Sequence, residues 1–120
     1  MNIQEDYVSF ETAKLLKEKG FNEFTFSDYN ENGIAQFNEV ETRVAKGCQR
    51  PTLQMAMKWL REVHNINIDI VSIWNKVRWE YQVFVITPEN AKHCYVDDKL
   101  YLCHEQACEA AIKYCLENLI

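Results

Sequence analysis

The chain has 120 residues, of which 48% are hydrophobic and 26% charged, and its formal net charge is −5. This length suits one domain with its own core, so we expect a single domain over residues 1–120. An acidic chain lacks the basic surface on which nonspecific nucleic-acid binding depends, and that function is not expected. No apolar run approaches the ~18 residues that cross a bilayer, so we expect no membrane protein.

The first residues and the cysteines both indicate a reducing compartment. Glu5 and Asp6 stand where a secretory signal peptide would carry positive charge and then apolar residues. The five cysteines are an odd number without a CxxC pair, which suits free thiols better than a disulfide framework. We therefore expect a cytoplasmic protein.

A metal site is the sharper alternative for some of the cysteines. Its ligands would come from two histidines and three cysteines: His93, Cys94, Cys103, His104 and Cys108. No pair among them has a zinc-knuckle spacing, and Cys108 also fits an apolar helical stripe in which a thiol packs as a hydrophobe. We predict no metal and no cofactor.

A capped helix followed by a hairpin is predicted in the first third of the chain. Ser9 is a suitable N-cap, and Gly20 is a suitable end for a helix over 10–19. Apolar and polar residues alternate over 24–29 and 34–40, on either side of a four-residue turn that contains Asn32 and Gly33. These two segments are predicted to pair as antiparallel strands.

Residues 41–50 have no clear period and include Gly47, so we expect a loop that leads to the next helix. Arg43, Lys46 and Arg50 lie in this loop, and loops carry a large share of binding groups. The three residues are the best candidates for contacts to an anion in an otherwise acidic chain. The alternative is that they are ordinary solvated charges.

An amphipathic helix that continues into a strand forms the centre of the chain. Thr52 follows a proline and is a suitable cap for a helix that begins near Leu53. One face of the helix is apolar and is predicted to be buried: Leu53, Ala56, Met57, Leu60, Val63 and His64. Asn65 suits a left-handed helix end, and alternating isoleucines then predict a strand over 66–73.

The longest strand is predicted over 77–86, after a two-residue turn at Asn75 and Lys76. Apolar residues alternate along it, but Phe84 and Ile86 add apolar side chains on the opposite face. Helices on one side of a sheet leave this second face uncovered, so we expect a homodimer that buries it.

The last element is a helix over 104–118 with an apolar stripe at helical spacing. Before it, residues 94–96 and 100–102 form either a short hairpin or one bulged edge strand. The complete pattern predicts an α+β fold in the order α-β-β-α-β-β-(β)-α. Because the hairpins are tight, the sheet of four to six strands is mostly antiparallel, with three helices on one face.

No pattern typical of catalysis occurs, and the three glycines form no phosphate-binding loop. A cysteine nucleophile with His64, His93 or His104 as base is chemically allowed, but no third orienting group is recognisable. We therefore predict no catalytic residue. Among the tryptophans, Trp59 lies off the apolar stripe of its helix and Trp74 beside a turn, so both are expected to be partly exposed.

Three segments resemble one group of known proteins. They are YVSFETAKLLKEKGF near the start, PTLQMAMKWLREVHNINI in the middle and HEQACEAAIKYCLENLI at the end. The segments are similar to small uncharacterised proteins encoded by phages and prophages of gut Bacteroidetes. This resemblance implies a phage-encoded protein of the host-cell cytoplasm with the same α+β layout, and it implies no activity.

The absence of a catalytic motif favours a nonenzymatic phage-type binding protein. Such a protein would be a host-defence antagonist that sequesters a nucleotide-like signal or blocks a host protein. The alternatives are a small enzyme that acts on a nucleotide signal and a structural or assembly module with no ligand.

The predicted ligand site lies where the basic loop meets the central helix, because free N–H groups at a helix N-terminus favour an anion. The residues predicted to contact the anionic small molecule are Arg43, Lys46, Arg50 and Thr52. Arg50 is the first choice, since a guanidinium can pair with a phosphate through two hydrogen bonds. Trp74 or Trp79 would supply a stacking face.

Overall fold

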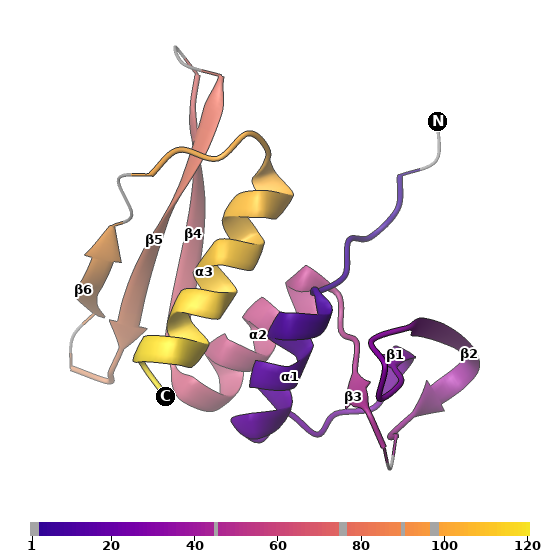
Figure 1. The fold of residues 1–120 in the computed structure, drawn as a ribbon. Helices are drawn as coiled ribbons and strands as arrows, with labels where there is room; N and C mark the ends of the chain where they lie inside the picture. The colour runs from indigo at the N-terminus through magenta and orange to yellow at the C-terminus, as the bar shows by residue number, and fades with distance from the viewer. Residues whose placement is uncertain (1–2, 45, 75–76, 90, 97–98) are drawn as a thin grey trace. The chain divides into compact units, whose positions relative to one another are not determined.

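The computed structural model describes residues 3–44, 46–74, 77–89, 91–96 and 99–120. Within these residues lie three helices and six strands, and the strands form two three-stranded antiparallel sheets (Figure 1). The predicted α+β class and antiparallel pairing are confirmed. The strands are divided between two sheets where the sequence predicted one, and the chain forms two compact units, Met1–Ala56 and Met57–Ile120.

The first unit holds one helix, one sheet and the start of the second helix. Its elements are α1 (Phe10–Glu18), β1 (Thr25–Tyr29), β2 (Ala35–Thr42), β3 (Cys48–Gln49) and the first residues of α2 (Leu53–His64). The strand order is β2-β1-β3, so β1 has a hydrogen-bonded neighbour along each edge. Helix α1 lies against β3.

Local signals determine α1 and the hairpin, as predicted. The Ser9 hydroxyl accepts a hydrogen bond from the Thr12 N–H at 3.2 Å, and Gly20 follows the helix with φ +97°. In the turn, the Asn30 side-chain oxygen accepts from the N–H groups of Asn32 at 2.8 Å and Ile34 at 3.0 Å. This side chain satisfies the turn donors and fixes the β1–β2 connection.

The prediction of a loop over 41–50 is partly wrong. Strand β2 continues to Thr42, and β3 pairs with the end of β1. The cause is a close approach at Gly47, which has φ +87° and where a Cβ atom would collide with the Tyr29 carbonyl oxygen. Only glycine suits such a position, and it brings Cys48 into register with Tyr29.

Helix α2 begins where predicted, because the Thr52 hydroxyl accepts from the Met55 N–H at 3.1 Å. Four of the residues predicted to be buried are so: Leu53, Ala56, Met57 and Leu60. Val63, which was predicted to be buried, is 55% exposed, and Trp59, which was predicted to be partly exposed, is only 7% exposed. Both of these predictions are wrong. The buried arc is rotated towards Trp59, whose ring meets the His64 ring edge-on at 4.7 Å.

The second unit continues from α2 into a sheet of consecutive strands. Its further elements are β4 (Ile66–Ile73), β5 (Arg78–Ile86), β6 (Ala91–Val96) and α3 (His104–Asn118). Asn65, with φ 58°, makes the predicted left-handed link to β4. The predicted turn at Asn75 and Lys76 lies outside the described residues. Helix α3 crosses one face of the sheet against β4 and β5 (Figure 1).

The register of β5 separates its two faces as predicted. Val83 is opposite Ile68 and fully buried, whereas Phe84 is opposite Asn67 on the other face and only half-buried. The short hairpin, one of the two alternatives for the next segment, is not formed among the described residues, because Val96 and Tyr101 both pair with residues of β5. Strand β6 shifts register against β5, and Tyr101 makes a separate bridge with Trp79.

Candidate functional site

The predicted site residues are distributed over both units. Arg43, Lys46, Arg50 and Thr52 belong to the first, and Trp74 and Trp79 to the second. Trp74 is 85% exposed, as predicted. Trp79 is half-buried, and its ring meets the His104 ring edge-on at 5.1 Å. Within the first unit, the aromatic rings that contact Arg50 come from tyrosine and phenylalanine.

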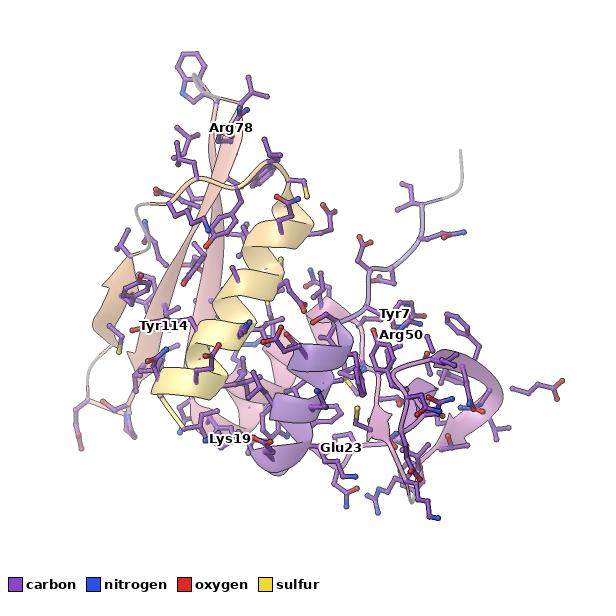
Figure 2. The ribbon with its side chains drawn as sticks, viewed as in Figure 1. Tyr7, Lys19, Glu23, Arg50, Arg78 and Tyr114 are labelled. Carbon is purple, nitrogen blue, oxygen red and sulfur yellow. The ribbon has the colours of Figure 1, made fainter. Side chains whose placement is uncertain are left out.

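Arg50 is held by three aromatic rings and one strand. The guanidinium carbon lies 4.3 Å from the ring centroid of Tyr7, 5.3 Å from that of Tyr29 and 5.1 Å from that of Phe37. Figure 2 shows the Tyr7 and Arg50 side chains next to each other. Nη1 donates to the Ser27 hydroxyl at 3.0 Å, whereas Nε is buried and has no hydrogen-bond partner among the described residues. Cation–π attraction offsets part of the cost of removing this charge from water.

Segments distant in sequence build this arrangement. Strand β1 supplies Tyr29, and the register of the hairpin places Phe37 directly opposite Ser27. The third ring, Tyr7, comes from a short N-terminal segment that forms a bridge with Thr52.

The N-terminal segment is tied to the chain on both sides of Tyr7. The Val8 N–H donates to the Pro51 carbonyl at 3.1 Å, and the Leu53 N–H donates to the Asp6 carbonyl at 2.8 Å. The Tyr29 hydroxyl adds a hydrogen bond of 2.6 Å to the Val8 carbonyl. These bonds keep the Tyr7 ring against Arg50.

The start of α2 uses its backbone donors within the chain. Leu53 N–H donates to Asp6, and Met55 N–H donates to the Thr52 hydroxyl. Placement of an anion at this helix end therefore remains a prediction, and it would have to compete with both bonds.

The other two basic residues lie at the surface. The Arg43 guanidinium carbon lies 4.2 Å from the Phe24 ring centroid, and both residues are exposed. Lys46 is exposed in the turn before β3. A solvated cation near an aromatic face is available to a ligand without loss of a buried contact.

An apolar hollow of about 220 Å³ lies beside Arg50, and we call it the aromatic hollow. Its lining comes from one unit: Tyr7, Phe24, Thr25, Phe26, Glu41, Arg50, Pro51, Thr52 and Met55. Phe24 is 46% exposed, Phe26 52% and Met55 36%. Ligand sites are typically concave and apolar with a few polar groups, which is the composition found here.

Sequence reasoning found Arg50 and Thr52 in this lining and missed the aromatic walls. The alternation of 24–29 does indicate a strand, but the buried side chains are Thr25, Ser27, Asp28 and Tyr29. Phe24 and Phe26 therefore face outward. A strand whose polar side chains are buried and whose phenylalanines are exposed indicates a binding surface. This pattern can be recognised only when the burial of each side chain is known.

One cysteine and one histidine come into contact among the described side chains, and the thiol of this pair is buried. Cys108 Sγ lies 3.4 Å from His104 Nδ1, but Cys108 is fully buried. Burial, with a smaller contribution from Cys94, raises the pKa of the Cys115 thiol to about 12. Burial likewise raises the pKa of Cys48. Thiols with raised pKa values are poor nucleophiles, because the thiolate is the reactive form.

The described residues contain no group of three or more histidine, cysteine or acidic side chains suited to a metal ion. The predicted alternative included His93, whose side chain lies outside those described. Nowhere in the described part of the chain is a helix both long and apolar enough to cross a membrane.

Comparison with known proteins assigns no family. The chain matches no protein-family model, no curated protein and no solved structure. The fold and site define an α+β protein of two antiparallel sheets with an aromatic hollow in its first unit.

Proposed function

We propose that the protein is a nonenzymatic binding protein that holds the planar ring of a nucleotide-like ligand in the aromatic hollow. The observation that carries this proposal is the exposure of Phe24 and Phe26 on the wall of a concave apolar site. Nucleobases stack on aromatic side chains, each stack contributing about 1–3 kcal/mol. The volume of about 220 Å³ suits one ring system rather than a large ligand.

Binding without turnover is favoured by the chemistry of the hollow. Its charged side chains are Arg50, which is packed against three rings, and Glu41, which is exposed. The lining has no cysteine, histidine or serine to act as nucleophile or general base in the usual combinations.

The biological setting is part of the same proposal. The resemblance of three segments to phage-encoded proteins supports a role in the host-cell cytoplasm, where the protein would sequester a nucleotide signal of host defence. The cysteines form no disulfide among the described residues, which is compatible with a reducing compartment.

Calorimetric titration with mono-, di- and cyclic nucleotides tests the proposal. We expect one nucleotide to bind and to be recovered unchanged after the protein is denatured. Phe26→Asp should weaken that binding by about tenfold or more, because a charge replaces a stacking wall. Ile34→Asp is the matched control, since Ile34 is 59% exposed in the same unit and lies outside the lining.

Two outcomes would contradict the proposal. Recovery of a chemically altered nucleotide would identify an enzyme. Equal loss of binding in Phe26→Asp and Ile34→Asp would show that the ligand does not sit in the aromatic hollow.

A second candidate function is the capture of an aromatic side chain from a host protein. It is favoured by Met55, whose 36% exposure extends the apolar surface beyond the two phenylalanines. A photo-crosslinking amino acid at position 55, irradiated in host cells, would attach to such a partner. The attachment should disappear when Phe26→Asp is added.

We also propose self-association through the face of the second sheet opposite α3. The apolar residues Ile86 on β5 and Val96 on β6 are 43% and 42% exposed, and Phe84 lies on the same face between Ile86 and Gln82, the residue opposite Val96. Exposed apolar strands of this kind are typical of subunit contacts.

A further inference from the structure

Among the described residues, no carboxylate pairs with the positive charge of Arg50. Its polar contacts are with Ser27, where the Arg50 N–H donates to the carbonyl and Nη1 donates to the hydroxyl, each at 3.0 Å. Its remaining contacts are with three ring faces, and no ion pair joins it to another residue in the described ranges.

The Arg50 side chain lines an apolar hollow, and these surroundings strengthen its attraction for an anion. The interaction energy between two charges rises as the local dielectric constant falls. A guanidinium among aromatic walls therefore attracts an anion more strongly than a guanidinium in water does. Glu41 also lines the hollow, but it is exposed, and solvent screens its opposing charge. Arg43, stacked on the wall residue Phe24, adds a second cation nearby.

We infer that the ligand of the aromatic hollow carries a phosphate or carboxylate, and that Arg50 pairs with this anionic group. The inference rests on the proposed function, because it specifies the charge of the ligand held there. The rings of Tyr7, Tyr29 and Phe37 fix the guanidinium before the ligand arrives. Pairing therefore needs little ordering of the side chain, which favours affinity.

The test compares charged and uncharged probes that share a ring. AMP is paired with adenosine, and 3-phenylpropionate with 3-phenylpropanamide, so that phosphate and carboxylate are examined separately. We expect at least one anion to bind the wild-type protein about tenfold more tightly than its uncharged counterpart. Arg50→Gln should remove the preference, and Arg50→Lys should remove most of it, because lysine does not reproduce a planar guanidinium held between rings.

A measurement on the wild-type protein covers the case in which Arg50 variants fail to fold. The Arg50 Nε–H is buried, so its nitrogen signal should be protected from exchange and observable by NMR. We expect this signal to shift with the anionic probe and to stay within error with its uncharged partner. Lys14→Gln is the control variant, because Lys14 is an exposed cation of the same unit outside the lining, and it should retain the preference for the anion.

The outcomes separate the inference from the function on which it rests. If Met55 methyl signals move with adenosine and AMP alike while the Arg50 Nε signal stays unchanged, the hollow binds a ring and the Arg50 inference is wrong. The inference also fails if Arg50→Gln keeps the full preference for the anion. If no probe moves the Met55 signal, the proposed function fails, and the inference fails with it.

Discussion

Gln49 joins three segments of the first unit through one buried amide. Its Nε2 donates to the Thr42 carbonyl at 2.6 Å and the Thr25 hydroxyl at 2.8 Å, and its Oε1 accepts from the Val44 N–H at 2.6 Å. The side chain thereby replaces main-chain partners that the two-residue β3 is too short to provide. A buried polar side chain is thus part of the scaffold that carries the hollow.

Cys115 should make stability depend on pH in the alkaline range. Burial raises its pKa to about 12, so the folded state keeps the proton that an unfolded thiol loses near its ordinary pKa of about 8.5. The stabilising effect is complete below the unfolded pKa and is lost as pH rises towards about 12. Urea melts should show the contribution of Cys115 falling by at most about 1.4 kcal/mol per pH unit in this window.

Cys115→Ala is the comparison for this prediction. The variant loses stability at all pH values because a buried side chain is truncated, but its curve should be flatter than that of the wild type between pH 8.5 and pH 10. Parallel curves would mean that the Cys115 thiol ionises equally easily in both states.

At the scale of elements, α2 provides the clearest test of packing. Leu60 is fully buried, and Leu60→Ala should lower the free energy of unfolding by about 2–5 kcal/mol, because truncation leaves a cavity. Val63→Ala on the same helix is the control, since Val63 is 55% exposed and should cost well under about 1 kcal/mol. Similar urea midpoint shifts for both variants would contradict the observed buried face.

Elements with local signals could be predicted from sequence, and elements set by distant contacts could not. The caps at Ser9 and Thr52 and the turn at Asn30 are satisfied by neighbours a few positions away. Strand β3 depends on Tyr29, whose carbonyl lies close to Gly47, so its two residues carry no recognisable pattern of their own.

The residues of the candidate site also differ in whether they could be predicted from sequence. Arg50 was identifiable as a basic residue in a loop next to a helix. Its aromatic partners were not, because Tyr7, Tyr29 and Phe37 come from three separate segments. The stacking residues predicted instead, Trp74 and Trp79, belong to the second unit.

At the scale of the whole molecule, the two sheets differ in how their strands are ordered. The second sheet follows the chain as β4-β5-β6, whereas the first places β1 between β2 and β3. In the sequence, a helix precedes the three strands of each sheet. The same order of elements along the chain therefore leads to two different strand orders. Hydrophobic periodicity reports which face of a strand is apolar and not which strands become neighbours.

Self-association should be measurable and separable from folding. Sedimentation at micromolar to millimolar concentration is expected to show a dimer, and Phe84→Asp should dissociate it, because a charge would be buried in the contact. Circular dichroism should remain that of the folded protein. Val40→Asp, at a 66% exposed position on β2, should leave the dimer intact. A wild-type protein that sediments only as a monomer would overturn the proposal.

The bridge between Tyr7 and Thr52 also sets the order in which the chain acquires its site during synthesis. Tyr7 is made before its partners Pro51, Thr52 and Leu53, which follow only when the first unit is nearly complete. Contacts between such distant residues form late, because a long loop must be closed before they contribute. The nascent chain therefore carries Tyr7 and the outward phenylalanines without their final neighbours, and the hollow is complete only after Met55, the last residue of its lining, has been made.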